Sequence, residues 1–233
     1  MALPGGTSDR VLLVEGQDDD HVIRHLCDCS GLVRDFSIVQ KGGFSELLRS
    51  IPVELAAPGR SALGVVVDAN DNPAARWQAV RDRCERRGIT LPSEPDPGGV
   101  VVEGRPRVGL CLDDAPITLD GAPVVVEGRP RVGVWLMPDN KSPGQLEDLV
   151  AAMIPAEDVV WRLAQDFVDR IPEPERPKPA IKAQVHAWLA ARAAARPMGS
   201  AIGTGHLDAS SPAATSFIGW LNRLFHDSAG VGA

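Results

Sequence analysis

The first seventy residues alternate between two hydrophobic periods, and this alternation constrains the fold more than any other feature of the sequence. Short apolar runs such as VLLVE and LGVVV have the composition of buried strands. Between them, apolar residues recur every three or four positions, as in amphipathic helices. Strands that alternate with helices form a parallel sheet with helices on its faces. The sequence therefore predicts an open α/β fold.

The same two periods predict the positions of the elements along the chain. Strands are expected at 11–15, 36–40, 63–67 and 132–137, and helices at 18–30, 44–55, 73–87, 144–154, 156–171, 180–196 and 211–225. Pro52 is a candidate break within the second helix. Residues 8–155 are expected to form the α/β domain, and residues 156–228 a helical C-terminal extension packed on it.

The decapeptide VVVEGRPRVG occurs at Val100 to Gly109 and again, identically, at Val124 to Gly133. Its composition is typical of β-ribbon, so we interpret it as a strand-turn-strand unit duplicated within an insertion at 88–131. A tolerated surface hairpin is the simpler interpretation, and a functional tongue is the alternative. Each copy runs into an apolar segment that competes for the fourth core strand. We favour the second copy, because a predicted helix follows it directly.

Composition narrows the classes of function. Hydrophobic residues make up 44% of the 233 residues and charged residues 24%, an ordinary globular balance. The net charge of −7 argues against binding nucleic acid over the whole surface, although one basic groove or a bound metal stays open. Neither zinc-like cysteine spacing, nor a signal-peptide pattern, nor an apolar run long enough to cross a membrane is found. A reduced, cytoplasmic protein is therefore expected.

Acidic residues follow three of the predicted strands. Glu15 ends the first strand, Asp68 the third, and Asp139 lies just after the fourth. Because the carboxyl ends of parallel strands lie at one edge of a sheet, these carboxylates are expected to converge. Clustered carboxylates raise each other's pKa unless a cation joins them, and Mg²⁺ or Mn²⁺ favours such oxygen ligands. A site with two such ions would suit phosphodiester cleavage.

Several of these acids also have a purely structural explanation. Asp71 and Asp139 fit turns, and Asp18 and Asp19 suit the N-terminus of a helix. Glu15 differs, because a glutamate that closes an apolar strand next to glycine has no evident turn or capping role. It is therefore the strongest functional candidate.

Two motifs resemble those of Toprim domains. VEGQDD (Val14 to Asp19) is similar to their first motif, an apolar strand followed by glutamate, glycine and, three positions later, aspartate. VVVDAND (Val65 to Asp71) resembles their second motif, an Asp-x-Asp, with Asn70 in place of the second aspartate. Over most of residues 10–226 the chain is similar to a bacterial Toprim-related family, through GVVVDAN, WLMPDN followed by GQLEDL, KAQVHAWLA and WLNRLF. The duplicated ribbon lies outside that pattern.

The resemblance implies a Toprim-like parallel sheet with a Mg²⁺ site, as in primases, topoisomerases and overcoming-lysogenization-defect nucleases. It makes Glu15 a metal ligand or a general base, Asp68 the main ligand, and Lys182 the lysine near the scissile phosphate. It places either Asn70 or Asp71 in the second ligand position, and it implies a second metal site completed by Asp139 together with Glu147 or Asp148. Separately, the turn formed by Lys41, Gly42 and Gly43 either presents backbone amides to a phosphate or is only a turn.

The implied activity is Mg²⁺- or Mn²⁺-dependent cleavage or transfer of phosphodiester bonds in DNA or RNA, by a nuclease of defence or DNA repair. A partner ATPase or a homo-oligomer is compatible with this activity, and no membrane association is expected. The alternative is a non-catalytic Toprim-like module that binds nucleic acid or protein. Asn70 and the negative net charge favour the alternative, whereas the number of retained acids opposes it.

Overall fold

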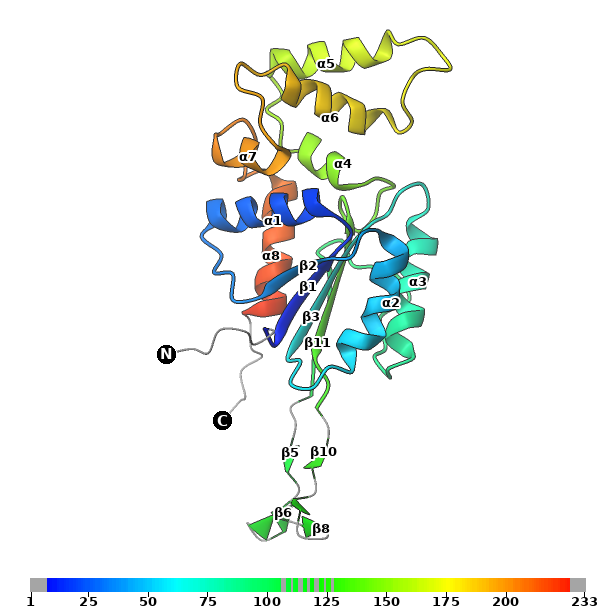
Figure 1. Cartoon of the computed structure of the whole chain (residues 1–233), viewed down its shortest axis with the longest axis vertical. Coiled ribbons are helices and arrows are strands. Elements are labelled where there is room, and N and C mark those ends of the chain that lie inside the picture. Colours follow the sequence, from blue (N-terminus) through cyan, green and yellow to red (C-terminus); the bar gives the residue numbers. More distant parts are fainter. Residues whose placement is uncertain are drawn as a thin grey trace.

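A five-stranded sheet forms the centre of the computed structural model (Figure 1). Its strands are β1 (Arg10–Val14), β2 (Ser37–Gln40), β3 (Ala62–Asp68), β4 (Val100–Val102) and β11 (Arg131–Met137). The order is β2-β1-β3-β11-β4, in which the first four strands are parallel and β4 is antiparallel. The structure describes residues 8–105 and 128–226, and between these ranges only short strands. The predicted α/β class is confirmed.

Helices cover both faces of this sheet. Helices α1 (Gln17–Ser30) and α8 (Pro212–Phe225) cover one face, and α2 (Phe44–Leu55) and α3 (Pro73–Glu85) cover the other. The further described helices are α4 (Leu146–Ala151), α5 (Val159–Asp169), α6 (Ala180–Ala190) and α7 (Met198–Gly203). Alternate residues of each strand enter different cores, because side chains of a strand alternate in direction. Leu12 and Val14 join the core under α1 and α8, whereas Val11 and Leu13 join the core under α2 and α3.

The duplicated decapeptides lie opposite each other in one antiparallel ribbon. Beyond β4 and β11, the ribbon contains β5 (Val108–Gly109), β6 (Cys111–Leu112), β7 (Ala115–Pro116), β8 (Thr118–Leu119), β9 (Ala122–Pro123) and β10 (Val125–Val126). Each copy is therefore one arm, rather than the expected strand-turn-strand unit. Val101 and Val102 of the first copy pair with Gly133 and Val132 of the second, and Val125 and Val126 of the second pair with Gly109 and Val108 of the first. Arg105 bridges to its equivalent Arg129. Identical strands pair in this way because an antiparallel pair has a local two-fold axis.

The second copy supplies the fourth parallel strand, as predicted. All seven residues of β11 align in parallel register with β3, so this strand lies next to the centre of the sheet. The first copy supplies only the antiparallel edge strand β4, which pairs with β11 through three residues. Both copies therefore contribute a strand to the same sheet, and the chain between β4 and β11 connects the edge strand to its parallel neighbour.

Helix α8 packs directly against the sheet because two strands have glycine beneath it. A β-carbon on Gly133 would lie 2.7 Å from Cδ2 of Leu224, and one on Gly64 would lie 2.9 Å from the same atom. Trp220 of α8 also donates from Nε1 to the carbonyl of Val100, 3.0 Å away, which attaches the helix to the edge strand. The last helix therefore shares a hydrophobic core with the sheet on which it packs.

Some helices differ from their predicted ranges. Helix α2 continues through Pro52, and α7 was not predicted. Helix α6 ends at Ala190 instead of continuing to Arg196, and Arg192 beyond its end forms an ion pair with Asp158. Helices α5 and α6 form an antiparallel hairpin beyond α4, at the end of the molecule opposite the ribbon (Figure 1). Among the described residues, no helix has the length and apolarity that a membrane span requires.

The glycines under α8 lead to a stability prediction. Gly133→Ala should lower the free energy of unfolding by about 1–3 kcal/mol, because the added methyl group overpacks a core in which Leu224 is 1% exposed. Gly219→Ala within α8 is the matched control. Its methyl group would meet only Arg223, at 3.8 Å, so alanine should stabilise the helix by about 0.5–1 kcal/mol. Denaturant unfolding of both variants checks the prediction, and equal effects would contradict it.

Candidate carboxylate site at the edge of the sheet

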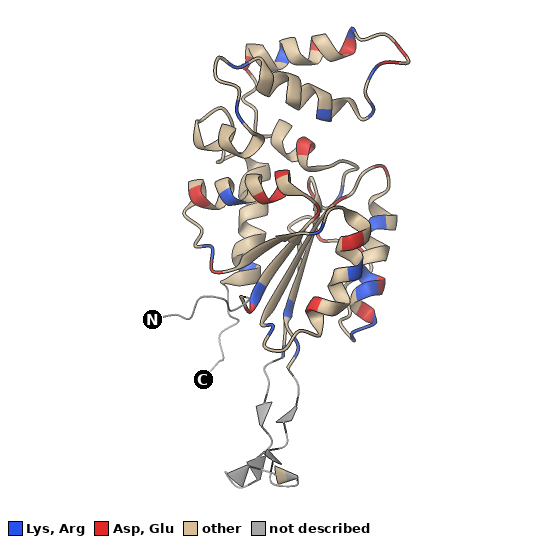
Figure 2. Cartoon of the chain, viewed as in Figure 1, with Lys and Arg blue, Asp and Glu red and all other residues tan. Residues whose placement is uncertain are grey.

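Four carboxylates meet at the carboxyl edge of the parallel strands. Glu15 follows β1, Asp68 ends β3, Asp19 lies in the first turn of α1, and Glu147 lies in the first turn of α4. We call these four residues the acid cluster. Figure 2 shows acidic residues of α1 and α4 near this edge, with α6 beyond them. The edge forms here because every helix that follows a parallel strand begins at that strand's carboxyl end.

Backbone amides connect the carboxylates to neighbouring elements. Glu15 Oε1 accepts a hydrogen bond of 2.9 Å from the backbone nitrogen of Asp68. Asp68 Oδ1 in turn accepts one of 3.0 Å from the nitrogen of Leu146, the first residue of α4. Asp19 Oδ2 accepts one of 2.9 Å from Gly16, which precedes α1. These bonds offset part of the cost of burying negative charge, because the amides at helix N-termini carry partial positive charge.

Burial raises the pKa of three members of the acid cluster, Glu15, Asp19 and Asp68, and neighbouring carboxylates add to the rise at Asp19 and Asp68. The pKa of Asp68 rises to about 8, first through burial and then through the charges of Asp19, Glu15 and Glu147. The pKa of Asp19 rises to about 7 for the same reasons, with burial again the larger cause. Burial also raises the pKa of Glu15, although the hydrogen bond from Asp68 opposes the change. At neutral pH the cluster therefore resists full ionisation unless cationic charge is added.

Lys182 of α6 supplies one such charge. Its Nζ lies 2.7 Å from Oε1 of Glu147, and the lysine side chain is half exposed while the glutamate is buried. The hydrogen bond to Glu147 raises the pKa of Lys182, and the charges of Asp18 and Asp68 act in the same direction. The structure thus brings the predicted lysine of α6 into direct contact with one of the predicted acids, Glu147 of α4.

Asp139 and Asp148 accept hydrogen bonds from residues that are close to them in the sequence. The Asp139 carboxylate is exposed and accepts hydrogen bonds from the backbone of Lys141 and Ser142 and from the Ser142 hydroxyl. Burial alone would raise the pKa of Asp139, but these bonds outweigh it and the pKa is lowered. Asp148 Oδ2 accepts a bond of 2.8 Å from the nitrogen of Gln145, which caps α4. The expected convergence of strand-end acids therefore includes Glu15 and Asp68 and leaves Asp139 outside.

The backbone conformation of the loop after β3 explains why residue 70 is asparagine. Asn70 has a φ of 48°, a left-handed conformation that asparagine tolerates better than most residues. Its backbone exchanges hydrogen bonds of 2.6 and 2.9 Å with Gly144, which fastens this loop to the loop before α4. Asp71 is exposed beside it. The assignment of Asn70 and Asp71 as metal ligands stays a prediction.

The Lys41-Gly42-Gly43 turn uses most of its donors within the fold. The amide of Lys41 donates to the carbonyl of Val14, and that of Gly43 donates to the carbonyl of Glu15. The Lys41 ammonium lies 3.5 Å from Glu54. Of the three amides, only that of Gly42 has no protein acceptor among the described residues. These bonds favour the turn over the phosphate-binding interpretation.

The acid cluster has the oxygen ligands of a divalent-cation site, but its side chains are not yet arranged around a common point. Carboxylate oxygens are the ligands that Mg²⁺ and Mn²⁺ prefer. Across the described ranges, however, no three His, Cys, Asp or Glu side chains are already arranged to hold a metal ion. Instead, Oε1 of Glu15 accepts from the backbone nitrogen of Asp68, and Oε1 of Glu147 pairs with the ammonium of Lys182. The residues fit such a cation chemically, provided that Lys182 or the carboxylates turn.

Two members of the site were not selected from the sequence. Asp19 was visible in VEGQDD but was explained there as a helix-start residue, a role that it does have. Arg76 of α3 lowers the pKa of Glu15 by electrostatic attraction, and its Cζ lies 3.8 Å from the centre of the Phe44 ring. The signal for Arg76 was its place in the first turns of a helix that begins at the same sheet edge.

These features define an α/β protein with a buried acid cluster at the carboxyl edge of a mostly parallel sheet. The chain belongs to the family described as "Protein of unknown function (DUF3226)", whose model matches residues 9–226. No curated protein and no solved structure shows a significant match. The family match covers the sheet, the acid cluster and all the helices.

Titration of the acid cluster should make stability depend on pH. In the unfolded chain, aspartates titrate near pH 4, whereas in the folded chain Asp19 and Asp68 titrate at about 7 and 8. The folded protein therefore binds more protons between these values, and its stability should fall as pH rises from about 4 to about 8. Urea unfolding in a chelating buffer measures this fall. Asp68→Asn should make it shallower, while Asp71→Asn should not; an equal slope in all three proteins would contradict the expectation.

Removing the lysine should leave a buried charge without its partner. Lys182→Met should lower the free energy of unfolding by about 1–3 kcal/mol at neutral pH, because Glu147 is 3% exposed. The double variant Lys182→Met with Glu147→Gln should recover most of that loss. Lys178→Met, which changes an exposed lysine nearby, is the control and should cost little. Equal losses in the single and double variants would show that the ion pair is not the cause.

Proposed function

We propose that this protein is a Toprim-like enzyme that cleaves or transfers phosphodiester bonds of DNA or RNA with Mg²⁺ or Mn²⁺. The observation that carries the proposal is the acid cluster with Lys182 beside it, at the sheet edge where open α/β folds bind ligands. The pKa values of Asp19 and Asp68 are raised by burial and by neighbouring negative charges. Such shifts are common in functional sites. The two motifs that resemble Toprim domains contribute Glu15, Asp19 and Asp68 to this cluster.

In this proposal Asp68, Asp19 and Glu147 hold the divalent cation. Oδ2 of Asp68 and Oε2 of Glu147 accept no hydrogen bond in the described part of the chain, so both are available as ligands. When bound, such a cation neutralises the cluster, polarises a phosphate oxygen and lowers the pKa of a bound water. Its binding requires the three carboxylates to ionise together, which the mutual repulsion of the cluster otherwise opposes.

Glu15 and Lys182 have the remaining roles. Glu15 accepts hydrogen bonds from the backbone of Asp68 and Phe44, and in this proposal its carboxylate also takes the proton of an attacking water. The Lys182 ammonium, half exposed and next to Glu147, turns toward the phosphate and offsets the negative charge that grows in the transition state. The positive charge of Arg76 also acts on Glu15 and balances part of its negative charge.

A second candidate function rests on the ion pair itself. If Lys182 permanently neutralises Glu147 and protons neutralise Asp19 and Asp68, the site needs no cation. The chain is then a Toprim-like module that binds nucleic acid or a protein without cutting. The Lys182–Glu147 ion pair and the structural role of Asn70 favour this alternative. The setting in defence or DNA repair, and a partner ATPase, rest on the resemblance and apply to both candidates.

The experiment is incubation of the purified chain with plasmid, single-stranded DNA and RNA in Mn²⁺, Mg²⁺ or chelator. Cleavage is expected with either metal and not with chelator. Glu15→Gln and Asp68→Asn should each reduce the rate at least about 100-fold, because they remove a proton acceptor and a ligand. Lys182→Met should also reduce the rate.

Asp139→Asn and Asp71→Asn are the matched controls, because they remove carboxylates that lie outside the acid cluster, and both should keep full activity. Equal products from the wild type and Asp68→Asn would indicate a contaminating nuclease. Calorimetry with Mn²⁺ separates the two candidates. Binding that Asp68→Asn abolishes supports the enzyme, while nucleic-acid binding that is unaffected by metal supports the non-catalytic module.

A further inference from the structure

Helix α5 carries an apolar stripe on its outward face. Val159, Leu163 and Phe167, each four residues apart, are 58%, 61% and 62% exposed. The opposite face of the helix, with Ala164 and Val168, is buried. Helix α6 lies between α5 and the rest of the molecule, so α5 is the outermost element at this end (Figure 1). Three large apolar side chains in one row are unusual on a surface that nothing covers.

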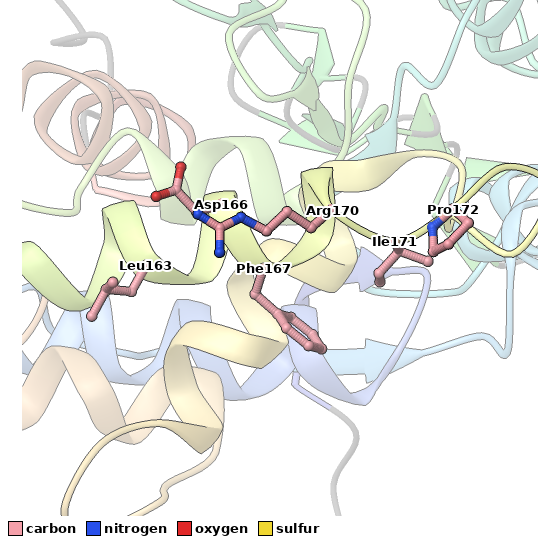
Figure 3. Close-up of a pocket in the computed structure, with 6 residues that line it drawn as sticks. All are labelled: Leu163, Asp166, Phe167, Arg170, Ile171 and Pro172. Carbon is pink, nitrogen blue, oxygen red and sulfur yellow. The ribbon is translucent and has the colours of Figure 1, made fainter.

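A hollow extends the stripe toward the end of the helix. It has a volume of about 390 Å³, and it is lined by Leu163, Asp166, Phe167, Arg170, Ile171 and Pro172. Figure 3 shows Leu163 and Phe167 projecting from the same side of α5, with Ile171 and Pro172 in the turn beyond. An apolar side chain of a docking partner could enter this hollow between Phe167 and Ile171.

Charged residues run along one side of the stripe. Arg162, Asp166 and Arg170 are exposed, alternate in sign and are four residues apart. In the described part of the chain, none of these three side chains has an ion-pair partner. A partner for this surface must therefore present an apolar row beside a row of alternating charge.

A second copy of α5 presents both an apolar row and a row of alternating charge, when the two helices are aligned in a particular register. When two such helices pack antiparallel about a two-fold axis, like sides of the helices face each other. If Arg162 of one copy lies level with Asp166 of the partner subunit, the same contact repeats on the other side of the axis. We propose that α5 is the interface of a homodimer, in which the two helices pack antiparallel in this register.

The apolar rows interlock in that register. Each residue advances a helix by about 1.5 Å, so Leu163 and Leu163 of the partner subunit lie about 3 Å apart along the axis. Val159 of the partner subunit then lies level with the gap between Phe167 and Ile171, where the hollow opens. The register that pairs Arg162 with Asp166 of the partner subunit therefore also brings an apolar side chain to the hollow. The inference does not depend on the activity proposed above.

One helix per subunit makes a small interface, so the dimer should be weak. Stable complexes bury about 1,200–2,000 Å², more than a pair of three-turn helices provides. Sedimentation velocity of the full chain from about 10 μM to about 1 mM should show monomers converting to dimers. Leu163→Asp should abolish the dimer. Val53→Asp, which alters an equally exposed valine on α2, should leave it intact. A wild type that is monomeric throughout would overturn the proposal.

A charge exchange tests the register. Arg162→Asp places aspartate opposite aspartate, and Asp166→Arg places arginine opposite arginine, so each variant alone should dimerise about tenfold more weakly. Mixed together, the two variants should form a heterodimer at least as readily as the wild type, because every facing pair is then of opposite sign. Labelling one variant with a fluorophore makes this heterodimer visible in sedimentation.

The mixed experiment distinguishes a second copy from any other occupant. A surface that binds an unrelated apolar peptide gives no recovery on mixing, and failure of the mixture to associate overturns the proposal. Circular dichroism of each variant confirms that α5 remains folded, since Arg162 and Asp166 are exposed and their exchange removes no core contact. Dimerisation of both single variants with wild-type affinity would also overturn it.

Discussion

The hydrogen bond from the backbone of Asp68 to Glu15 is the contact on which the edge of the sheet depends. It joins the ends of β1 and β3, and the Asp68 carboxylate continues the connection by accepting from Leu146 at the start of α4. The salt bridge between Glu147 and Lys182 then reaches α6. A single line of polar contacts thus links four elements that are distant in sequence, and it does so with carboxylates that burial would otherwise destabilise.

This arrangement is costly unless positive charge balances it. The N-termini of α1 and α4 and the side chains of Arg76 and Lys182 provide part of that balance. The raised pKa values of Asp19 and Asp68 indicate that the balance is incomplete without protons or a cation. The stability of the fold, its dependence on pH and the proposed metal binding are therefore connected. All three depend on how many of these carboxylates are ionised.

The sequence predicted most elements whose apolar period is long, such as α1, α8 and β3. It missed α7, whose six residues MGSAIG contain too few apolar positions to show a period. That helix exists because Gly199 allows its backbone to approach α1 closely: a β-carbon there would lie 2.5 Å from the carbonyl oxygen of His21. The repeat was visible as sequence, but nothing local indicated that its two copies would pair with each other.

By itself the sequence determined the alternation of strands and helices, and with it the edge at which Glu15 and Asp68 had to meet. That follows because chain direction fixes where parallel strands end. Tertiary structure decided which other side chains join them. Asp139 turns to its own loop while Asp19, Glu147 and Lys182 turn inward, a choice made by hydrogen bonds and burial that no spacing encodes. It also decided that one face of α5 is uncovered, since only packing shows which side of an amphipathic helix lacks a neighbour.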